Sequence, residues 1–198
     1  AAKEEKLNEL SNHNLTENDL IKGCLAGDRW IQELLYQRFA SKMFAVCLRY
    51  ANNAEDAQDL LQEGFIKVYR NLEKFRKEGS FEGWVRRVFV NTAIEHYRRK
   101  VNLSPINEKE ERNIEDGAWN VLDHLAGKDI IQLVQGLSPG YRSVFNMYVI
   151  EGYSHKEIGD LLKISEGTSK SQLARAKAIL QKKVGEFPGN KHKSLTRL

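Results

Sequence analysis

SHKEIGDLLKISEGTSKSQLARAKAILQKK, residues 154–183, is the stretch that decides the fold of this chain. Ser154 followed three residues later by Glu157 is a capping-box pattern, which predicts a helix beginning at His155. The apolar residues of that helix recur three and four positions apart, so they predict one buried stripe: Ile158, Leu161 and Leu162.

A second helix is predicted from about Glu166 to about Val184, because residues 163–165 break the first pattern and Ser165 can cap a new helix. One face of it is small or apolar: Ser169, Leu173, Ala176 and Leu180. Basic and hydroxyl side chains fall outside that face and can meet solvent: Lys170, Ser171, Arg175 and Lys177. Two short helices at a tight turn indicate a helix-turn-helix, whose narrow tip can enter a DNA major groove. The alternative is an ordinary helical hairpin with a solvated basic face.

The segment before this pair completes a small helical unit. Ser138 before Pro139 predicts a helix over about Pro139 to Glu151 that stops at Gly152. Its inward positions are predicted to be Val144, Phe145, Tyr148 and Val149. A helix over about Asp129 to Gln135 precedes it, and the resulting four-helix unit is a plausible DNA-binding domain.

The composition is that of a soluble globular protein, and the sequence predicts no metal and no cofactor. The chain has 198 residues, of which 41% are hydrophobic and 29% charged. It contains no apolar run near the roughly 20 residues of a membrane span, and its charged N-terminus is no secretory signal. Cys24 and Cys47 stand far apart and are predicted to be buried thiols in a reducing cytoplasm, and the scattered histidines predict no metal site.

The charge is segregated along the chain. A net charge of +4 is too mild to indicate nucleic-acid binding by itself. Residues 154–184, however, hold seven Lys or Arg against three acids, whereas residues 101–125 hold two against six. The second stretch lacks apolar periodicity and predicts a flexible acidic linker. The predicted divisions are a tail at 1–14, a helical domain at 15–101, a linker at 102–124, a second helical domain at 125–185 and a basic tail at 186–198.

The first domain is predicted to be all-α as well. Residues 16–19, TEND, are a helix-start signature, and a second helix over about Arg29 to Phe39 runs almost directly into further core positions from Met43. The helix over residues 53–72 is strongly amphipathic, with a predicted buried stripe of Ala57, Leu60, Leu61, Phe65, Val68 and Leu72.

Four acids cluster on the outer face of that helix: Glu55, Asp56, Asp59 and Glu63. The macrodipole favours acids near a helix start, which explains part of the cluster. Four within nine residues exceed what capping requires, so they can also form a negative patch that docks a basic partner surface.

A basic loop at residues 73–80 leads into a helix over residues 81–100, FEGWVRRVFVNTAIEHYRRK. A helical wheel predicts a core face of Phe81, Trp84, Val85, Val88 and Thr92. Arginines and aromatic candidates occupy the adjoining face: Arg86, Arg87, Val90, Asn91, Ile94, Tyr97 and Arg98. Arginine for phosphates with aromatic rings for unpaired bases is the combination that single-stranded DNA binding needs.

With these motifs in place, the chain resembles the extracytoplasmic-function sigma factors of bacterial RNA polymerase, which have sigma regions 2 and 4 only. AEDAQDLLQEGFIKVYRNLEKF is similar to their helix that binds the polymerase clamp coiled coil, and FEGWVRRVFVNTAIEHYRRK to the part that opens and reads the promoter −10 element. LSPGYRSVFNMYVIEGYSHKEIGDLLKISEGTSKSQLARAKAIL is similar to region 4, which reads the −35 element.

The resemblance implies roles for individual residues. It assigns polymerase binding to Glu55, Asp56, Asp59, Gln62 and Glu63. It assigns binding of the −10 element to Phe75, Arg76, Arg86, Arg87, Asn91, Tyr97, Arg98 and Arg99. The loop at residues 73–80 is expected to form the wall of a pocket for a flipped base. It assigns binding of the −35 element to Lys156, Thr168, Lys170, Ser171, Gln172 and Arg175. The implied partners are core polymerase (clamp coiled coil and flap), promoter DNA (duplex at −35, single-stranded at −10) and an anti-sigma factor, which is often membrane-bound.

One departure and two rival functions remain. Ser169 stands where the family usually has Val, which predicts slightly looser packing of the recognition helix. A stand-alone helix-turn-helix regulator that binds duplex DNA as a dimer is the main rival, although it does not require an acidic patch followed by an arginine-aromatic helix. A helical enzyme using the four clustered acids is the second, but their spacing lacks a Glu-x-x-His pattern.

Overall fold

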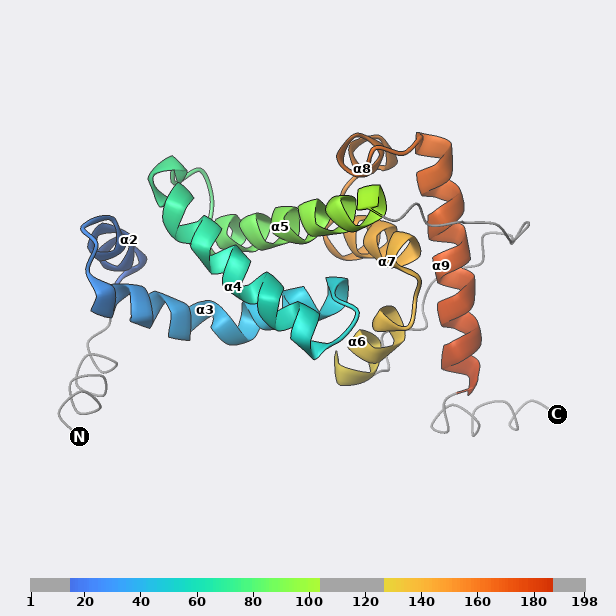
Figure 1. Cartoon of the computed structure of the whole chain (residues 1–198), viewed down its shortest axis with the longest axis horizontal. Coiled ribbons are helices and arrows are strands. Elements are labelled where there is room, and N and C mark those ends of the chain that lie inside the picture. Colours follow the sequence, from blue (N-terminus) through green and yellow to red (C-terminus); the bar gives the residue numbers. More distant parts are fainter. Residues whose placement is uncertain (1–14, 104–126, 187–198) are drawn as a thin grey trace.

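The computed structural model describes residues 15–103 and 127–186, and every element within those ranges is helical, as predicted. The elements follow in this order (Figure 1): α2 Glu17–Leu25, α3 Arg29–Tyr50, α4 Ala54–Asn71, the 3-10 turn η1 Leu72–Lys74, α5 Phe81–Leu103, α6 Gly127–Gln135, α7 Pro139–Phe145, the π-helical turn η3 Asn146–Ile150, α8 His155–Leu162 and α9 Glu166–Glu186. Residues 102 and 103 of the predicted linker continue α5, and the rest of that linker lies outside the described residues. So do the predicted tails, except for residue 186 at the end of α9.

Local caps fix where the helices of the first half begin. The Thr16 hydroxyl accepts a hydrogen bond from Asp19 N at 3.2 Å, and the Asp19 carboxylate accepts one from Thr16 N at 3.0 Å. This capping box starts α2. Asp28 caps α3 by accepting from Trp30 N and Ile31 N, and Asn53 caps α4 by accepting from Asp56 N at 2.7 Å. Each helix therefore starts within a residue or two of the position its sequence indicates.

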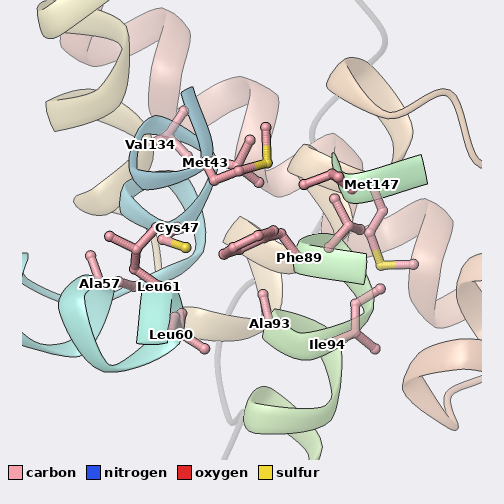
Figure 2. Packing of buried hydrophobic residues seen from close by; sticks show 14 of the residues in the cluster. Met43, Cys47, Ala57, Leu60, Leu61, Phe89, Ala93, Ile94, Val134 and Met147 are labelled. Atoms are coloured by element: carbon pink, nitrogen blue, oxygen red, sulfur yellow. The ribbon is translucent and has the colours of Figure 1, made fainter. Parts of the chain in front are cut away.

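Helices α3, α4 and α5 form the core of the first half. All six residues of the predicted α4 stripe are buried, at 5% exposure or less. Helices α4 and α5 approach closely at Gly64, where a Cβ atom would lie 2.7 Å from Phe89 Cζ. The Phe89 ring packs edge-on against Phe65, with centroids 5.2 Å apart, and lies at the centre of the buried cluster (Figure 2).

Helices α6 to α9 form the second half, in which α9 packs against α7 and α8. The Ser154–Glu157 capping box is present, with Ser154 N donating to the Glu157 carboxylate at 2.8 Å. Helix α8 ends at Leu162, and the next residue, Lys163, has a positive φ of 60° that turns the chain toward α9. Gly159 permits this turn, because a Cβ there would lie 2.9 Å from Ile164 O. The predicted α9 face is buried: Ser169, Leu173, Ala176 and Leu180.

The two halves pack against each other. Helix α3 contacts α6 and α7, and α5 contacts α7 and α8. The buried apolar residues of both halves form one cluster; Figure 2 draws Val134 and Met147 of the second half together with Met43 and Phe89 of the first. Helix α5 is consequently covered on two sides. The core face of α5 is therefore wider than predicted, because Val90 and Ile94, placed on the adjoining face, are 1% and 3% exposed.

The predicted inward face of the helix after Pro139 needs a second correction. Val144 and Phe145 are buried, but Tyr148 and Val149 are each 39% exposed, while Asn146 and Met147 are buried instead. The reason is contact with the first half of the chain: Asn146 Nδ2 donates to Arg49 O at 2.7 Å, and Met147 belongs to the buried cluster that both halves share. The same residues form the π-helical turn η3, in which Glu151 N donates to Asn146 O five residues earlier, at 3.0 Å.

Candidate nucleic-acid and protein-binding surfaces

The first candidate surface is the tip of α9. Ser165 caps this helix, because its hydroxyl accepts from Thr168 N at 2.9 Å and lies 2.8 Å from Thr168 Oγ1. Ser171 and Lys170 are exposed on the first turns, and Lys170 Nζ lies 2.7 Å from a Glu166 carboxylate oxygen. The cap thus presents a helix end with hydroxyl and ammonium donors, the groups that major-groove recognition uses.

Three further residues predicted for this surface lie in different environments. Lys156 is exposed on α8, and Arg175 is partly exposed, with Nη1 3.4 Å from the Tyr141 hydroxyl. Gln172 is only 3% exposed, on the side of α9 that packs against the rest of the half. Gln172 does not face the same side as Lys170 and Ser171, so its prediction as a DNA contact is not supported by its placement.

The departure at Ser169 has a local explanation. Its side chain is fully buried, and its hydroxyl lies 2.9 Å from His155 Nδ1. The His155 ring in turn stacks on Tyr148, with centroids 4.4 Å apart and planes 20° apart. The pKa of His155 is lowered, mainly because the ring is partly buried and also because the positive charge of Lys170 lies nearby. A hydroxyl at position 169 is therefore paired within the helix-turn-helix and joins α8 to α9.

The second candidate surface is a cavity of about 340 Å³ beside the start of α5. The predicted loop supplies one wall and α5 the other; its lining residues include Phe75, Arg76, Ser80, Trp84 and Arg87. Phe75 packs on Phe81 and Trp84, with ring centroids 5.2 and 5.6 Å apart. The loop holds its shape through two residues of positive φ, Lys77 at 59° and Gly79 at 119°. The cavity combines an aromatic wall with guanidinium groups.

The predicted phosphate-binding arginines of α5 do not share one environment. Arg87 is exposed, whereas Arg86 donates from Nε and Nη2 to the Glu151 carboxylate at 2.9 and 2.8 Å. The hydrogen bond with Glu151 raises the pKa of Arg86. Farther along, Arg98 is partly exposed and Tyr97 packs against the core cluster. Arg99 is exposed but donates to both oxygens of Glu63 at 3.0 and 2.9 Å.

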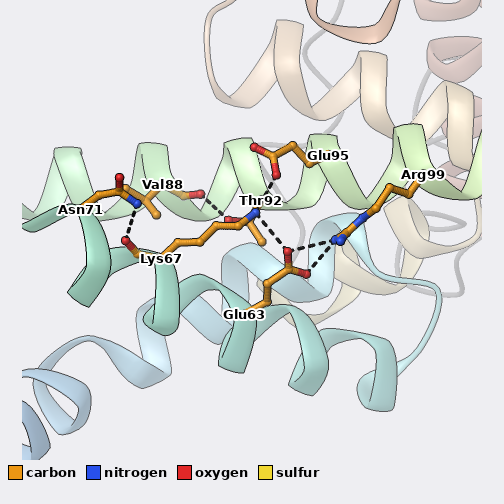
Figure 3. Close-up of polar contacts among 7 residues, drawn as sticks. All are labelled: Glu63, Lys67, Asn71, Val88, Thr92, Glu95 and Arg99. Atoms are coloured by element: carbon orange, nitrogen blue, oxygen red, sulfur yellow. Dashed lines mark hydrogen bonds and ion pairs between the residues drawn. The ribbon is translucent and has the colours of Figure 1, made fainter.

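The third candidate surface is the outer face of α4. Glu55, Asp59 and Gln62 are exposed there. Glu63 and Asp56 are instead partly buried and paired. Glu63 pairs with Lys67 at 3.0 Å and with Arg99 (Figure 3). Asp56 pairs with Lys100 at 3.1 Å. Burial raises the pKa of Glu63, but hydrogen bonds from Lys67 and Arg99 together lower it below 4.5. Two of the four clustered acids therefore join α4 to α5, and the remaining negative charge is carried by Glu55 and Asp59.

Sequence reasoning missed the residues that join the two halves, Glu151, Arg49 and Arg142. One signal for Glu151 was available, because an acid at the end of a helix is disfavoured by the macrodipole and suggests a partner elsewhere. Nothing in the local pattern indicates that Arg142 is buried at 3% exposure.

No helix in the described ranges has the length and apolar character to cross a bilayer, and those ranges contain no cluster of three or more potential metal-binding side chains.

Comparison with known proteins places these surfaces in a family context. Residues 35–102 match the family model for sigma-70 region 2, and residues 127–180 match that for sigma-70, region 4. The ECF RNA polymerase sigma-E factor of Haemophilus influenzae is 27% identical over 182 residues, 86% of this chain and 96% of that protein. The RNA polymerase sigma-H factor of Pseudomonas aeruginosa is 28% identical over 84% of this chain and 92% of its own length. A solved structure of CnrH in complex with the cytosolic domain of CnrY aligns with a TM-score of 0.44 at 18% identity, over 84% of this chain and 96% of that chain.

Proposed function

We propose that this chain, which belongs to the sigma-70 family and is an RNA polymerase sigma factor of its extracytoplasmic-function group, reads two promoter elements with its two halves. The second half, residues 125–185, recognises the −35 duplex, and the first, residues 15–101, binds polymerase and the opened −10 strand. Residues 102–124 connect them.

The −35 element is read by the tip of α9. Thr168, Lys170, Ser171 and Arg175 are the candidates for base and phosphate contacts, and Lys156 on α8 is a candidate for the flanking backbone. Their support is the Ser165 cap, which leaves hydroxyl and cationic donors exposed on the first turns of the helix. Donors on a helix tip reach base edges in the major groove, whereas donors along its side reach phosphates.

The −10 strand is held at the cavity beside α5. Its aromatic wall of Phe75 and Trp84 suits an unstacked base, because stacking on an aromatic ring contributes about 1–3 kcal/mol per base. Arg76 and Arg87 supply positive charge at the rim, and Asn91, Arg98 and Arg86 continue along the helix. This cavity is the single observation that carries the proposal, because a dimeric duplex-binding regulator, the main alternative, has no use for a pocket that accepts one unpaired base.

Polymerase is bound by the outer face of α4. We assign the direct contacts to Glu55, Asp59 and Gln62, which are exposed. Asp56 and Glu63 already pair within the chain, and they support that face by fixing α4 against α5. An acidic surface steers association with a basic one, so binding should weaken with salt.

The chain performs no covalent chemistry in this proposal. Binding energy from flipped and stacked bases drives strand opening, and polymerase makes the RNA. The proposed place of action is the cytoplasm, where the polymerase lies. We also propose an anti-sigma factor as a partner, which would act by covering the DNA-binding and polymerase-binding surfaces.

Run-off transcription with core polymerase and a promoter library tests this function directly. Asp59→Lys should reduce holoenzyme formation in gel filtration, while Glu33→Lys, at an exposed acid on α3, should not. We expect transcription that is selective for certain promoters. We also expect thymines near the start site to react with permanganate, which shows that the strands have opened. A chain that binds duplex DNA as a dimer, and never alters the promoter choice of polymerase, would refute the proposal.

A further inference from the structure

Helices α8 and α9 are attached to each other by hydrogen bonds at two places. At the turn between them, Ile164 N donates to Gly159 O at 3.1 Å. At the far end of α8, the imidazole of its first residue, His155, has Nδ1 2.9 Å from Ser169 Oγ on α9. One attachment would allow α9 to pivot about the turn, whereas two attachments fix the angle between the helices.

Apolar packing between the two helices does not replace the second attachment. Ile158 and Leu162 of α8 and Leu173 of α9 are buried, at 6% exposure or less. Burial of apolar surface is a non-directional force, so it brings the helices together without selecting one orientation. A hydrogen bond weakens steeply when its length or angle departs from the optimum. Ser169 is fully buried, so water does not substitute for its partner there.

The His155–Ser169 pair lies among the side chains that we assign to the −35 element. His155 directly precedes Lys156. Ser169 stands between Thr168 and Lys170, but its own side chain is buried and does not reach a base. A change in the angle between α8 and α9 would move Lys156 relative to Lys170. A shift of about 1 Å is enough to break a hydrogen bond to a base edge.

We propose that His155 and Ser169 are positioning residues, which set the angle of the recognition helix α9 and through it the selectivity for the −35 element. This inference rests on the proposed function of α9, and it adds two residues that act through their neighbours. It also gives the departure from the usual Val at position 169 a consequence. A Val side chain would only pack against α8, whereas the Ser169 hydroxyl forms a directional contact.

Protonation of His155 would change this contact. A neutral imidazole has one nitrogen that accepts a hydrogen bond, whereas both nitrogens of the charged ring donate. The Ser169 hydroxyl would then accept from Nδ1 and would have to turn its own hydrogen to another acceptor. In a helix that acceptor is the carbonyl four residues earlier, here Ser165 O, and bonds of this type bend helices. The bend would fall on the first turns of α9, where the DNA contacts are proposed.

The groups around the imidazole determine where this change occurs. Lys170 and Lys177 of α9 disfavour the charged ring, and Glu166 of α9 favours it. The Tyr148 ring of η3 stacks on the imidazole. Partial burial and then Lys170 have the largest effects, so the pKa of His155 lies below its ordinary value of 6.5. The neutral form is therefore dominant at neutral pH, and it is lost as pH falls below 6.5 through the lowered pKa.

Promoter affinities of the complex between the full chain and core polymerase test the proposal. One set of promoters varies the −35 element and a second varies the −10 element. The readout is the ratio of affinities for the best and the singly substituted sequence, at about pH 7.5 and about pH 5.5. Phosphate contacts are common to all sequences, so they cancel in this ratio.

Three variants separate positioning from general stability, which urea unfolding monitors. Ser169→Val fills the site but leaves His155 Nδ1 without its partner. His155→Asn keeps a polar atom near the Nδ1 position and does not titrate. Ser143→Ala is the matched control, because the Ser143 hydroxyl is equally buried in this half but donates to Pro139 O, at 2.8 Å, within its own helix.

Ser169→Val should lower the −35 ratio roughly fivefold, the effect of about one net hydrogen bond, and leave the −10 ratio unchanged. The wild-type −35 ratio should fall at the lower pH, and that of His155→Asn should stay at the wild-type value at both. Ser143→Ala should behave as the wild type does.

A folded Ser169→Val variant with full −35 selectivity would overturn the proposal, as would a pH response that persists in His155→Asn. An equal loss of −10 selectivity would also overturn it, because the effect would then not be confined to α9. A wild-type complex that selects −10 sequences but no −35 sequence would refute the proposed function of α9, and the positioning role with it.

Discussion

Gly64→Ala should destabilise the chain, although it improves helix propensity. Alanine inside a helix is favoured over glycine by about 1 kcal/mol. At position 64, however, the new methyl group would lie 2.7 Å from Phe89 Cζ and closer still to Cε1. The Phe89 ring is 1% exposed and held edge-on by Phe65, so it has little room to move.

The size of the effect follows from these two opposing terms. Overpacking a core costs roughly 1–3 kcal/mol, and a rigid neighbour places this site near the upper end. Subtracting the propensity gain of about 1 kcal/mol leaves a net loss of about 2 kcal/mol in the free energy of unfolding. Gly167→Ala is the control, because its nearest neighbour would be Ser165 Oγ at 3.7 Å. That variant should gain about 0.5 kcal/mol.

Urea unfolding followed by circular dichroism measures both variants. Combining Gly64→Ala with Phe89→Leu completes a double-mutant cycle, which should show a favourable coupling of about 1–2 kcal/mol because the smaller side chain admits the methyl group. A Gly64→Ala variant as stable as the wild type would show that Phe89 does not set the spacing between α4 and α5. Independent, additive effects of the two substitutions would lead to the same conclusion.

Arg175→Ala should cost about 1–3 kcal/mol and relax preference at one −35 base if it contacts a guanine, as binding to a duplex library would show; a uniform loss across all sequences would restrict it to phosphate. Arg98→Ala should leave the unfolding free energy nearly unchanged while lowering the salt dependence of single-strand binding by about one unit of slope, and an unchanged slope would remove it from the phosphate contacts. Glu63→Gln should flatten the acid dependence of stability: the pKa of Glu63 is lowered from 4.5, so its contribution is complete above that value and is lost as pH falls through the folded pKa. Urea unfolding across the acid range measures this, and parallel curves for Glu63→Gln and the wild type would contradict it.

Helix starts and single buried stripes were predictable because they depend on neighbours in sequence. A cap is a contact across three residues, as at Ser154 and Glu157, so its pattern is visible in any short window. The α4 stripe was equally readable, since α4 buries one face. The same method failed for α5, because Val90 and Ile94 are buried although they lie outside the predicted core face. Helix α5 packs against α4 on one side and α7 and α8 on another, and a one-face pattern cannot describe a helix with two buried faces.

The site was predictable in its residue types and less so in its pairings. The loop around Phe75 lines one cavity together with Arg87 of α5. Arg86 and Arg99, however, hold Glu151 and Glu63, partners 65 and 36 residues away. No window along the sequence contains such pairs. The helix after Pro139 has the same limit, because Asn146 and Met147 are buried by contact with the first half, which the local pattern of that helix does not contain.

Residues that break a local rule are the best pointers to such distant pairs. Glu151 at a helix end opposes the macrodipole, and the structure gives it two arginines. Ser169 puts a hydroxyl on a buried face, and His155 satisfies it. In both cases a choice that is unfavourable within its own helix is compensated by a group on another helix. Consistency between local preference and the global fold is the normal condition of a folded chain. A local violation at a helix end therefore indicates a contact elsewhere, and in this chain Glu151 leads to the arginine that DNA would need.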